Sequence, residues 1–203
     1  MRFEYLVNSL TDTLSYVKGD SARDTAEHLL EKYGSVDRIM AADTNVHTDD
    51  VAVGGTAALY IKLVASVISR MGTEKYKFGV THSTQQTDEY LKALFLPCSV
   101  ECVYALTYDK RGRALACDLI SEGVVNSSEL LPRKIVEVAT RRRAAYMIIA
   151  HNHPLGVASP SDADVAATMS IARILSNSGV SLVRHVIVSG NEITSIPVNM
   201  QAK

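Results

Sequence analysis

The feature that most constrains the fold is a continuous apolar run at residues 146–150. A strand with one solvated face alternates apolar and polar side chains, whereas a continuous run is typical of a strand buried on both faces. A second strand of this kind is predicted at residues 182–188. Helical patterns at residues 132–143 and 161–176 can cover such strands. The sequence therefore predicts an α/β sandwich, in which helices pack against a mixed sheet.

Further strand signals extend this sheet. Residues 100–108 are rich in β-forming side chains, and they are followed by a turn at residues 109–112 and by a second β-rich run at 114–120. Two such runs separated by a short turn predict a hairpin. A last strand is predicted at residues 193–196, after a Gly-Asn turn, and a short helix at 87–94 precedes the hairpin.

The first seventy residues have helical patterns and no strand pattern. Leu29 and Leu30 lie at helical spacing and are followed by a stop at Gly34, and Ser35 is placed to cap a short helix. A longer apolar helix is predicted at residues 57–71, after which the periodicity is lost. We therefore predict a small helical domain at 1–72, a linker at 73–86 and the α/β domain at 87–203.

Composition excludes several classes of protein. The 203 residues are 47 % hydrophobic and 21 % charged, which is typical of a globular chain. A net charge of −1 excludes a strongly basic protein that coats nucleic acid. We find no apolar run of the ~20 residues that cross a bilayer and no export signal. The cysteines, Cys98, Cys102 and Cys117, fit no zinc-knuckle spacing, and we interpret them as reduced thiols of a cytoplasmic protein.

The sharpest local signal is a pair of histidines directly after the buried strand. His151 and His153 are two residues apart, so an extended backbone directs both imidazoles to the same side. Pro154 disfavours helical angles at His153 and so preserves this geometry. Two converging histidines can begin a zinc site. The alternative is a pair of solvated polar residues at the end of a strand.

Ser161 and Asp164 open the helix that follows. Ser-x-x-Asp before an apolar helix is close to a capping box, and capping alone would explain both residues. The loop at 154–160 is also long enough to bring the start of the helix back over the end of the strand. Asp164 would then be a third, anionic ligand beside His151 and His153. Three protein ligands and one open position are typical of catalytic zinc, whereas structural zinc is closed by a fourth.

A metal-bound water also needs a base that does not itself bind the metal. Glu101 fits this description, because it is an acid at the head of a predicted strand and lies between apolar neighbours. An exposed carboxylate at a strand end is the alternative interpretation. Glu122 is a rival, but it lies in a Ser-Glu-Gly sequence that predicts a turn.

Together these residues match the JAB/MPN+ metalloprotease motif (JAMM), with Glu101, His-x-His and then Ser-x-x-Asp at the motif's spacing. The stretches ECVYALTYDKRGRAL, LPRKIVEVATRRRAAYMIIAHNHPLG and LVRHVIVSGNEITSI resemble the RadC family of bacterial JAB-domain proteins. The resemblance covers nearly the whole chain. It implies a JAB/MPN fold, which is similar to the cytidine-deaminase sandwich. The deaminase signature itself, His-x-Glu with Pro-Cys-x-x-Cys, does not occur in the sequence.

The resemblance also implies roles for the motif residues. His151, His153 and Asp164 would bind one zinc ion per chain. Glu101 would act as general base and then as acid toward the leaving amine, and Ser161 would hydrogen-bond the developing oxyanion. His185 matches a position where the family also tends to carry histidine, and we interpret it as a packed core residue. The leading hypothesis is a zinc-dependent peptidase or isopeptidase, with a peptide or protein as substrate.

Two other functions stay open. One is a DNA-associated repair or recombination factor with a structural or vestigial metal site, and the other is a phosphodiester hydrolase. Relatives often have a helix-hairpin-helix with Gly-x-Gly, whereas here Gly54 and Gly55 are adjacent. Residues 1–70 hold seven Lys and Arg against ten Asp and Glu, a net of −3. Phosphate binding needs cations, so DNA is not favoured as a partner, and the run at 141–143 is interpreted as cations at a helix end.

Overall fold

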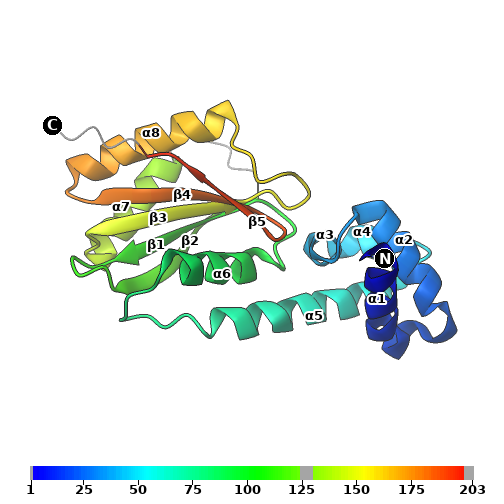
Figure 1. Ribbon diagram of the computed structural model, residues 1–203. Coiled ribbons are helices and arrows are strands. Elements are labelled where there is room, and N and C mark those ends of the chain that lie inside the picture. Colours follow the sequence, from blue (N-terminus) through cyan, green and yellow to red (C-terminus); the bar gives the residue numbers. More distant parts are fainter. Residues whose placement is uncertain (1, 124–129, 199–203) are drawn as a thin grey trace.

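The computed structural model describes residues 2–123 and 130–198 (Figure 1). The parts of the predicted domains at residues 1, 124–129 and 199–203 lie outside this description. The first third of the chain is helical, as the sequence predicted, with one short 3-10 turn after the first helix. Its helices are α1 (Arg2–Lys18), α2 (Ala22–Tyr33), α3 (Val36–Ala41), α4 (Thr44–Thr48) and α5 (Gly54–Thr73).

The boundary between α2 and α3 follows from two residues. Gly34 ends α2 in the left-handed region, with a φ of 77°, which glycine adopts without the steric strain of a side chain. Ser35 then caps α3, because its hydroxyl accepts a hydrogen bond from the backbone N–H of Arg38. Both predictions are confirmed. No helix was predicted at α4, a short helix that begins after Asp43, whose side chain accepts a hydrogen bond from the backbone N–H of Asn45.

The helical region has its own apolar core. Leu14, Leu29 and Ile39 are fully buried there, and α5 contributes Ala57 and Ile61. The opposite face of α5 is exposed and apolar. It carries Leu59, Leu63, Val67 and Met71. The apolar residues of α5 thus cover most of its circumference, and only one part of this apolar surface packs on the helical core.

The rest of the chain forms a five-stranded sheet in the order β2-β1-β3-β4-β5. Its strands are β1 (Cys102–Tyr108), β2 (Ala114–Glu122), β3 (Tyr146–Asn152), β4 (Ser181–Ser189) and β5 (Glu192–Ile196). Among the strands of the described residues, only β3 and β4 pair in parallel, and the other pairs are antiparallel. The sheet is therefore mixed, as predicted. Glu122, which the sequence placed in a turn, is instead the last residue of β2.

Helices cover both faces of the sheet (Figure 1). On one face lie α7 (Leu130–Arg142) and α8 (Asp162–Asn177), and on the other lies α6 (Thr84–Phe95). Successive side chains of β3 point to opposite faces of the sheet. Met147 packs beneath α7 and α8, whereas Ile148 packs in the core beneath α6. The apolar run is thus continuous because both faces of the strand are buried. Among the described helices, none combines the length and the apolar character needed to span a membrane.

The segment between α5 and α6 is packed rather than free. The N–H of Gly79 donates to the carbonyl of Ala114 at 2.7 Å, and the N–H of Ala114 donates to the carbonyl of Val80 at 2.8 Å. This segment therefore runs beside the start of β2. Helix α6 begins at Thr84, earlier than predicted, because Ser83 and Gln86 form a capping box. The division into domains at 1–72 and 87–203 stays a prediction.

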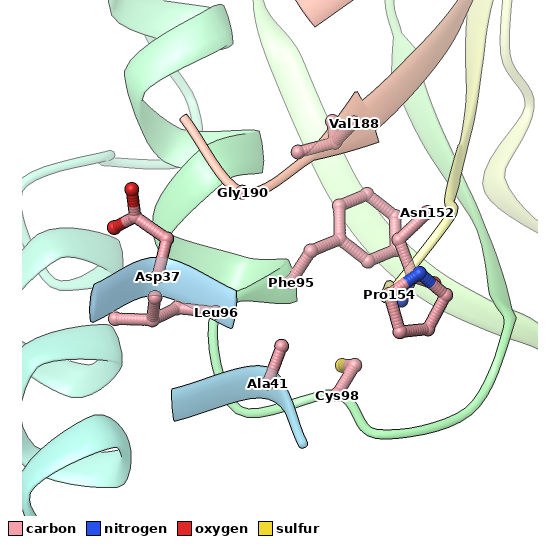
Figure 2. Close-up of a pocket in the computed structure, with 9 residues that line it drawn as sticks. All are labelled: Asp37, Ala41, Phe95, Leu96, Cys98, Asn152, Pro154, Val188 and Gly190. Carbon is pink, nitrogen blue, oxygen red and sulfur yellow. The ribbon is translucent and has the colours of Figure 1, made fainter. Parts of the chain in front are cut away.

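The helical region touches the sheet where β3 ends and where β4 turns into β5. Figure 2 shows Asp37 and Ala41 of α3 facing Gly190, Asn152 and Pro154 across a small pocket. A side-chain carbon built on Gly190 would lie only 3.3 Å from the β-carbon of Asp37, so the two backbones approach closely. The guanidinium of Arg38 donates to the carbonyl of Gly156 at 2.9 Å. The helices are thus in contact with the loop that follows β3.

Candidate metal centre

The end of β3 and the start of α8 bring three predicted ligands together. His151 is buried, with 2 % of its surface exposed, because its strand lies between β1 and β4. His153 follows just after β3, and the loop at 154–160 returns the chain to the first turn of α8, which holds Asp164. Ligand atoms from His151, His153 and Asp164 all lie within 4.8 Å of one another. This is the convergence that the sequence predicted.

The ring of His153 has a fixed orientation. Its Nδ1 lies 2.9 Å from the carbonyl oxygen of Val157, which can only accept a hydrogen bond. Nδ1 therefore carries the proton, and in the neutral ring Nε2 has a free lone pair. The carbonyl belongs to the loop that leads to α8, so the same loop positions both His153 and Asp164. This is the outer hydrogen bond that metal-binding histidines usually make.

His151 is oriented by a chain of hydrogen bonds that leads away from the centre. The Thr168 hydroxyl donates to the carbonyl of Asp164 at 2.6 Å, so it must accept from the Nδ1–H of His185. Nε2 of His185 then has a lone pair, and it accepts from the Nδ1–H of His151 at 2.9 Å. One arrangement of protons satisfies every member of this chain. It leaves Nε2 of His151 without a proton.

Burial keeps these two rings neutral. It lowers the pKa of His151 to about 4, partly offset by the nearby Asp164 carboxylate. It also lowers the pKa of His185 to about 3, with a further lowering from His151. Both rings are therefore uncharged at neutral pH, which is the state in which imidazole binds metal ions.

Three electron-rich atoms consequently face one another. The Nε2 atoms of His151 and His153 are 3.2 Å apart, and Nε2 of His151 is 3.4 Å from Oδ1 of Asp164. Oδ2 of Asp164 lies 4.0 Å from Nε2 of His153. Zinc–nitrogen bonds of about 2.0–2.1 Å in a tetrahedron place ligand atoms roughly 3.3 Å apart. The residues thus fit a tetrahedral cation in donor type and in spacing.

Ser161 lies in this first turn of α8, but its hydroxyl is engaged. It accepts from the N–H of Asp164 at 3.1 Å and donates to Oδ2 of Asp164 at 2.7 Å, and the N–H of Ser161 donates to the same oxygen at 2.8 Å. This is the capping box that the sequence offered as the alternative. Burial raises the pKa of Asp164, but the hydrogen bonds from Ser161 and the nearby histidines hold it below its usual value overall. The helix cap therefore also keeps the carboxylate ionised beside the histidines.

Glu122 lies on the face of the sheet away from His151, whereas Glu101 directly precedes β1. Val103 pairs with His151, and directly paired residues share a face. Glu101 is exposed and lies just before β1, two residues before Val103, and we expect the alternation of the strand to extend to it and direct it to the face of His151. Glu122 pairs with Cys102, whose side chain packs in the core beneath α6. The register therefore favours Glu101 over its rival as the acid nearer to the centre.

Two residues of this site were not predicted to belong to it. His185 is buried, as expected of a core residue, but its ring contacts His151. Thr168 ends the same chain of hydrogen bonds.

A mixed sheet with helices on both faces, and a His-x-His and Asp centre where β3 meets α8, define a JAB-type domain. Residues 81–201 match the RadC-like JAB domain family. The chain is 33 % identical over 180 residues to a UPF0758 protein of Photobacterium profundum, covering 88 % of this chain and 80 % of the relative. It is 30 % identical over 179 residues to one of Cupriavidus necator, covering 88 % and 78 %. The chain therefore belongs to the RadC-like JAB family.

Proposed function

We propose that this protein is a zinc-dependent hydrolase of amide bonds, acting as a peptidase or isopeptidase. The observation that carries the proposal is the convergence of two imidazoles and a carboxylate, whose ligand atoms all lie within 4.8 Å of one another and whose outer hydrogen bonds direct both Nε2 lone pairs inward. Such atoms repel one another unless a cation lies among them. In this proposal His151, His153 and Asp164 hold the metal, and a fourth position stays open as in catalytic zinc sites.

Zinc, when bound, lowers the pKa of a water ligand and polarises a substrate carbonyl. Glu101 accepts the proton of the attacking water and later delivers it to the leaving amine, as a base and then as an acid. Ser161 hydrogen-bonds the oxyanion that forms from the carbonyl. Because its O–H donates a hydrogen bond to Oδ2 of Asp164 before substrate binds, the hydroxyl must turn toward the substrate at that stage. His185 keeps Nε2 of His151 directed at the metal.

The proposal is tested first by metal content. We expect one zinc ion per chain in the purified protein and loss of high-affinity zinc binding in His151→Ala and Asp164→Ala, because two ligands rarely hold zinc. Elemental analysis measures both. Full zinc occupancy in His151→Ala would reject this ligand set.

Hydrolysis is then measured on a panel of fluorescence-quenched peptides and isopeptides. Glu101→Gln retains the shape of the side chain but removes the base, so the rate should fall by about 10²–10⁴-fold while zinc content is unchanged. Glu122→Gln is the matched control, since Glu122 lies on the other face, and it should retain activity. Equal losses in the two variants would contradict the assigned role of Glu101.

The same assay separates the alternatives. A duplex and a single-stranded DNA included in the panel would be cut if the activated water attacks phosphodiesters. A fully zinc-loaded protein that cleaves neither peptides nor nucleic acid would favour a structural metal site. No observation among the described residues favours either alternative at present.

A further inference from the structure

The side chain of Asn152 bonds to the backbone on both sides of Glu101. Its Oδ1 accepts from the N–H of Cys102 at 2.7 Å, and its Nδ2 donates to the carbonyl of Val100 at 3.1 Å. We infer that Asn152 is a positioning residue, which fixes Glu101 beside the metal centre. The inference rests on the proposed function, in which Glu101 acts as the base.

The chemistry of the carboxamide explains why asparagine suits this place. A backbone N–H can only donate and a backbone carbonyl can only accept, so the two partners determine which end of the amide faces each. The carboxamide offers the same donor and acceptor as a peptide group. Regular pairing of β1 with β3 ends at Val103 and His151. Beyond that pair, Asn152 takes over the bonding that a further backbone pair would have provided.

The bond to Cys102 is protected from water, and the bond to Val100 is partly protected. Asn152 is 3 % exposed, and the bond to Cys102 is fully buried. The carbonyl of Glu101 is held separately, because it accepts from the N–H of Gly123 at 2.8 Å. Glu101 thus has a fixed backbone but an exposed side chain. Asn152 and Gly123 therefore fix the backbone from which the carboxylate of Glu101 extends.

The position of Asn152 in the sequence links these hydrogen bonds to the metal centre. It lies between His151 and His153, so one residue connects the two imidazoles to the segment that carries the base. A shift of Val100 and Cys102 would move Glu101 relative to the ligands without removing any ligand. A small misplacement of a catalytic group is costly, because proton transfer requires hydrogen-bond reach.

The test measures how near the Glu101 carboxylate lies to the metal. The protein is loaded with Co²⁺, a paramagnetic ion that accepts the same imidazole and carboxylate ligands, and its glutamate carboxyl carbons are ¹³C-labelled. The Glu101 signal is identified by its absence in Glu101→Gln. Its paramagnetic shift, taken against the zinc-loaded protein, falls steeply with distance from the ion. This readout requires no substrate.

We compare Asn152→Ala with Thr107→Val. Thr107 is also buried and also on β1, but its hydroxyl bonds to the carbonyl of Ala116 on β2, at the far end from Glu101. Asn152→Ala should lose most of the Glu101 shift while it still binds one Co²⁺ per chain, and exchange of the Cys102 N–H should become about tenfold faster. Thr107→Val should retain the wild-type shift.

A second variant covers the case in which Asn152→Ala does not fold. Asn152→Asp has the same shape and keeps the acceptor for Cys102, but its carboxylate repels the carbonyl of Val100, so it should also reduce the shift. An unchanged Glu101 shift in either folded variant overturns the positioning role. Loss of Co²⁺ from both variants also overturns it, because Asn152 would then support metal binding by the histidines and not the position of Glu101. If wild-type Glu101 shows no shift at all, it is the proposed base that fails.

Discussion

At the scale of the residue, each side chain of the centre uses its two ends for different partners. His153 bonds to the carbonyl of Val157 through Nδ1 and directs Nε2 to the centre. His151 bonds to His185 through Nδ1 and likewise directs Nε2 inward. Asp164 directs Oδ1 toward Nε2 of His151, and its Oδ2 accepts from the backbone N–H and the hydroxyl of Ser161. The outer bond determines the rotation of each ring, and thereby where its lone pair points.

His185→Ala tests the outer bond of His151. We expect zinc affinity to fall by about 10–100-fold, the usual effect of removing an outer partner of a ligand, while the fold is retained. Competition with a chelator measures this affinity. His47→Ala is the matched control, because His47 is also a buried histidine but bonds to the carbonyl of Ile39 in the helical core. It should lower stability without changing zinc affinity, and an equal loss in both variants would contradict the role of His185.

That the three candidate ligands lie together could be predicted from sequence because their signal is local. His151 and His153 are two residues apart on one strand, and Ser161 and Asp164 form a cap signature. The contact between His151 and His185 could not be predicted in the same way. It depends on the parallel pairing of β3 with β4, which sets Ile149 beside His185 across 36 residues of chain. Neither spacing nor composition specifies that register.

At the scale of the element, helix ends were predicted well where a side chain caps them and less well elsewhere. Ser35 and Gly34 gave the boundary between α2 and α3 because cap and stop act within a few residues. The sequence began β1 at residue 100, but the strand begins at Cys102. The difference arises because the Asn152 side chain replaces backbone pairing there. This replacement of backbone pairing by a side chain depends on a residue that lies fifty positions away in the sequence.

Asp50, between α4 and α5, makes the helical region sensitive to acid. Hydrogen bonds from Lys32 at 2.7 Å and His28 at 2.8 Å lower the pKa of its carboxyl to about 2, against a small opposing effect of burial. The folded pKa is below the unfolded one, so the stabilisation is present above pH 4 and is lost as the pH falls through about 2.

We therefore expect the free energy of unfolding of the wild type to fall toward that of Asp50→Asn between about pH 4 and pH 2. Chemical denaturation across this range measures the difference between the two proteins. Asp49→Asn, at the exposed neighbouring residue, is the control and should follow the wild type. A difference between wild type and Asp50→Asn that stays constant with pH would contradict the prediction.

At the scale of the whole molecule, the helical region contacts the loop that holds His153. The carbonyl of Gly156 accepts from Arg38 at 2.9 Å and from the Ser189 hydroxyl at 2.9 Å, and the N–H of Gly156 donates back to the carbonyl of His153. The helices thus contact the loop that follows the candidate metal centre.

Arg38→Ala should weaken zinc binding by about 2- to 10-fold, which is the net effect expected of one lost hydrogen bond. Arg38→Lys should restore part of the loss, because lysine can still donate to the carbonyl. Arg23→Ala is the control, since Arg23 pairs with Glu4 and Glu27 within the helical region. Equal zinc affinities in the wild type and Arg38→Ala would show that the contact does not support the centre.

DNA binding is predicted to be weak for the whole chain. Six of the seven cations in residues 1–70 have partners within the described part of the molecule: they are Lys18, Arg23, Lys32, Arg38, Lys62 and Arg70. Arg141 and Arg142 pair with Asp118 of β2. Phosphate binding would have to break these contacts. Duplex binding measured across a salt series should show no salt-sensitive association at micromolar concentration, and a steep loss of affinity with salt would contradict this.

The segment that joins α5 to α6 has a further consequence. β2 is an edge strand, and an open edge offers unpaired N–H and carbonyl groups to the strands of other molecules. Gly79 and Val80 already form hydrogen bonds with the carbonyl and the N–H of Ala114, so the beginning of β2 cannot pair with a strand of another molecule. The segment between α5 and α6 therefore also protects the protein against aggregation. A cut or an insertion in this segment would expose the edge of β2 before it disturbed the packing of either core.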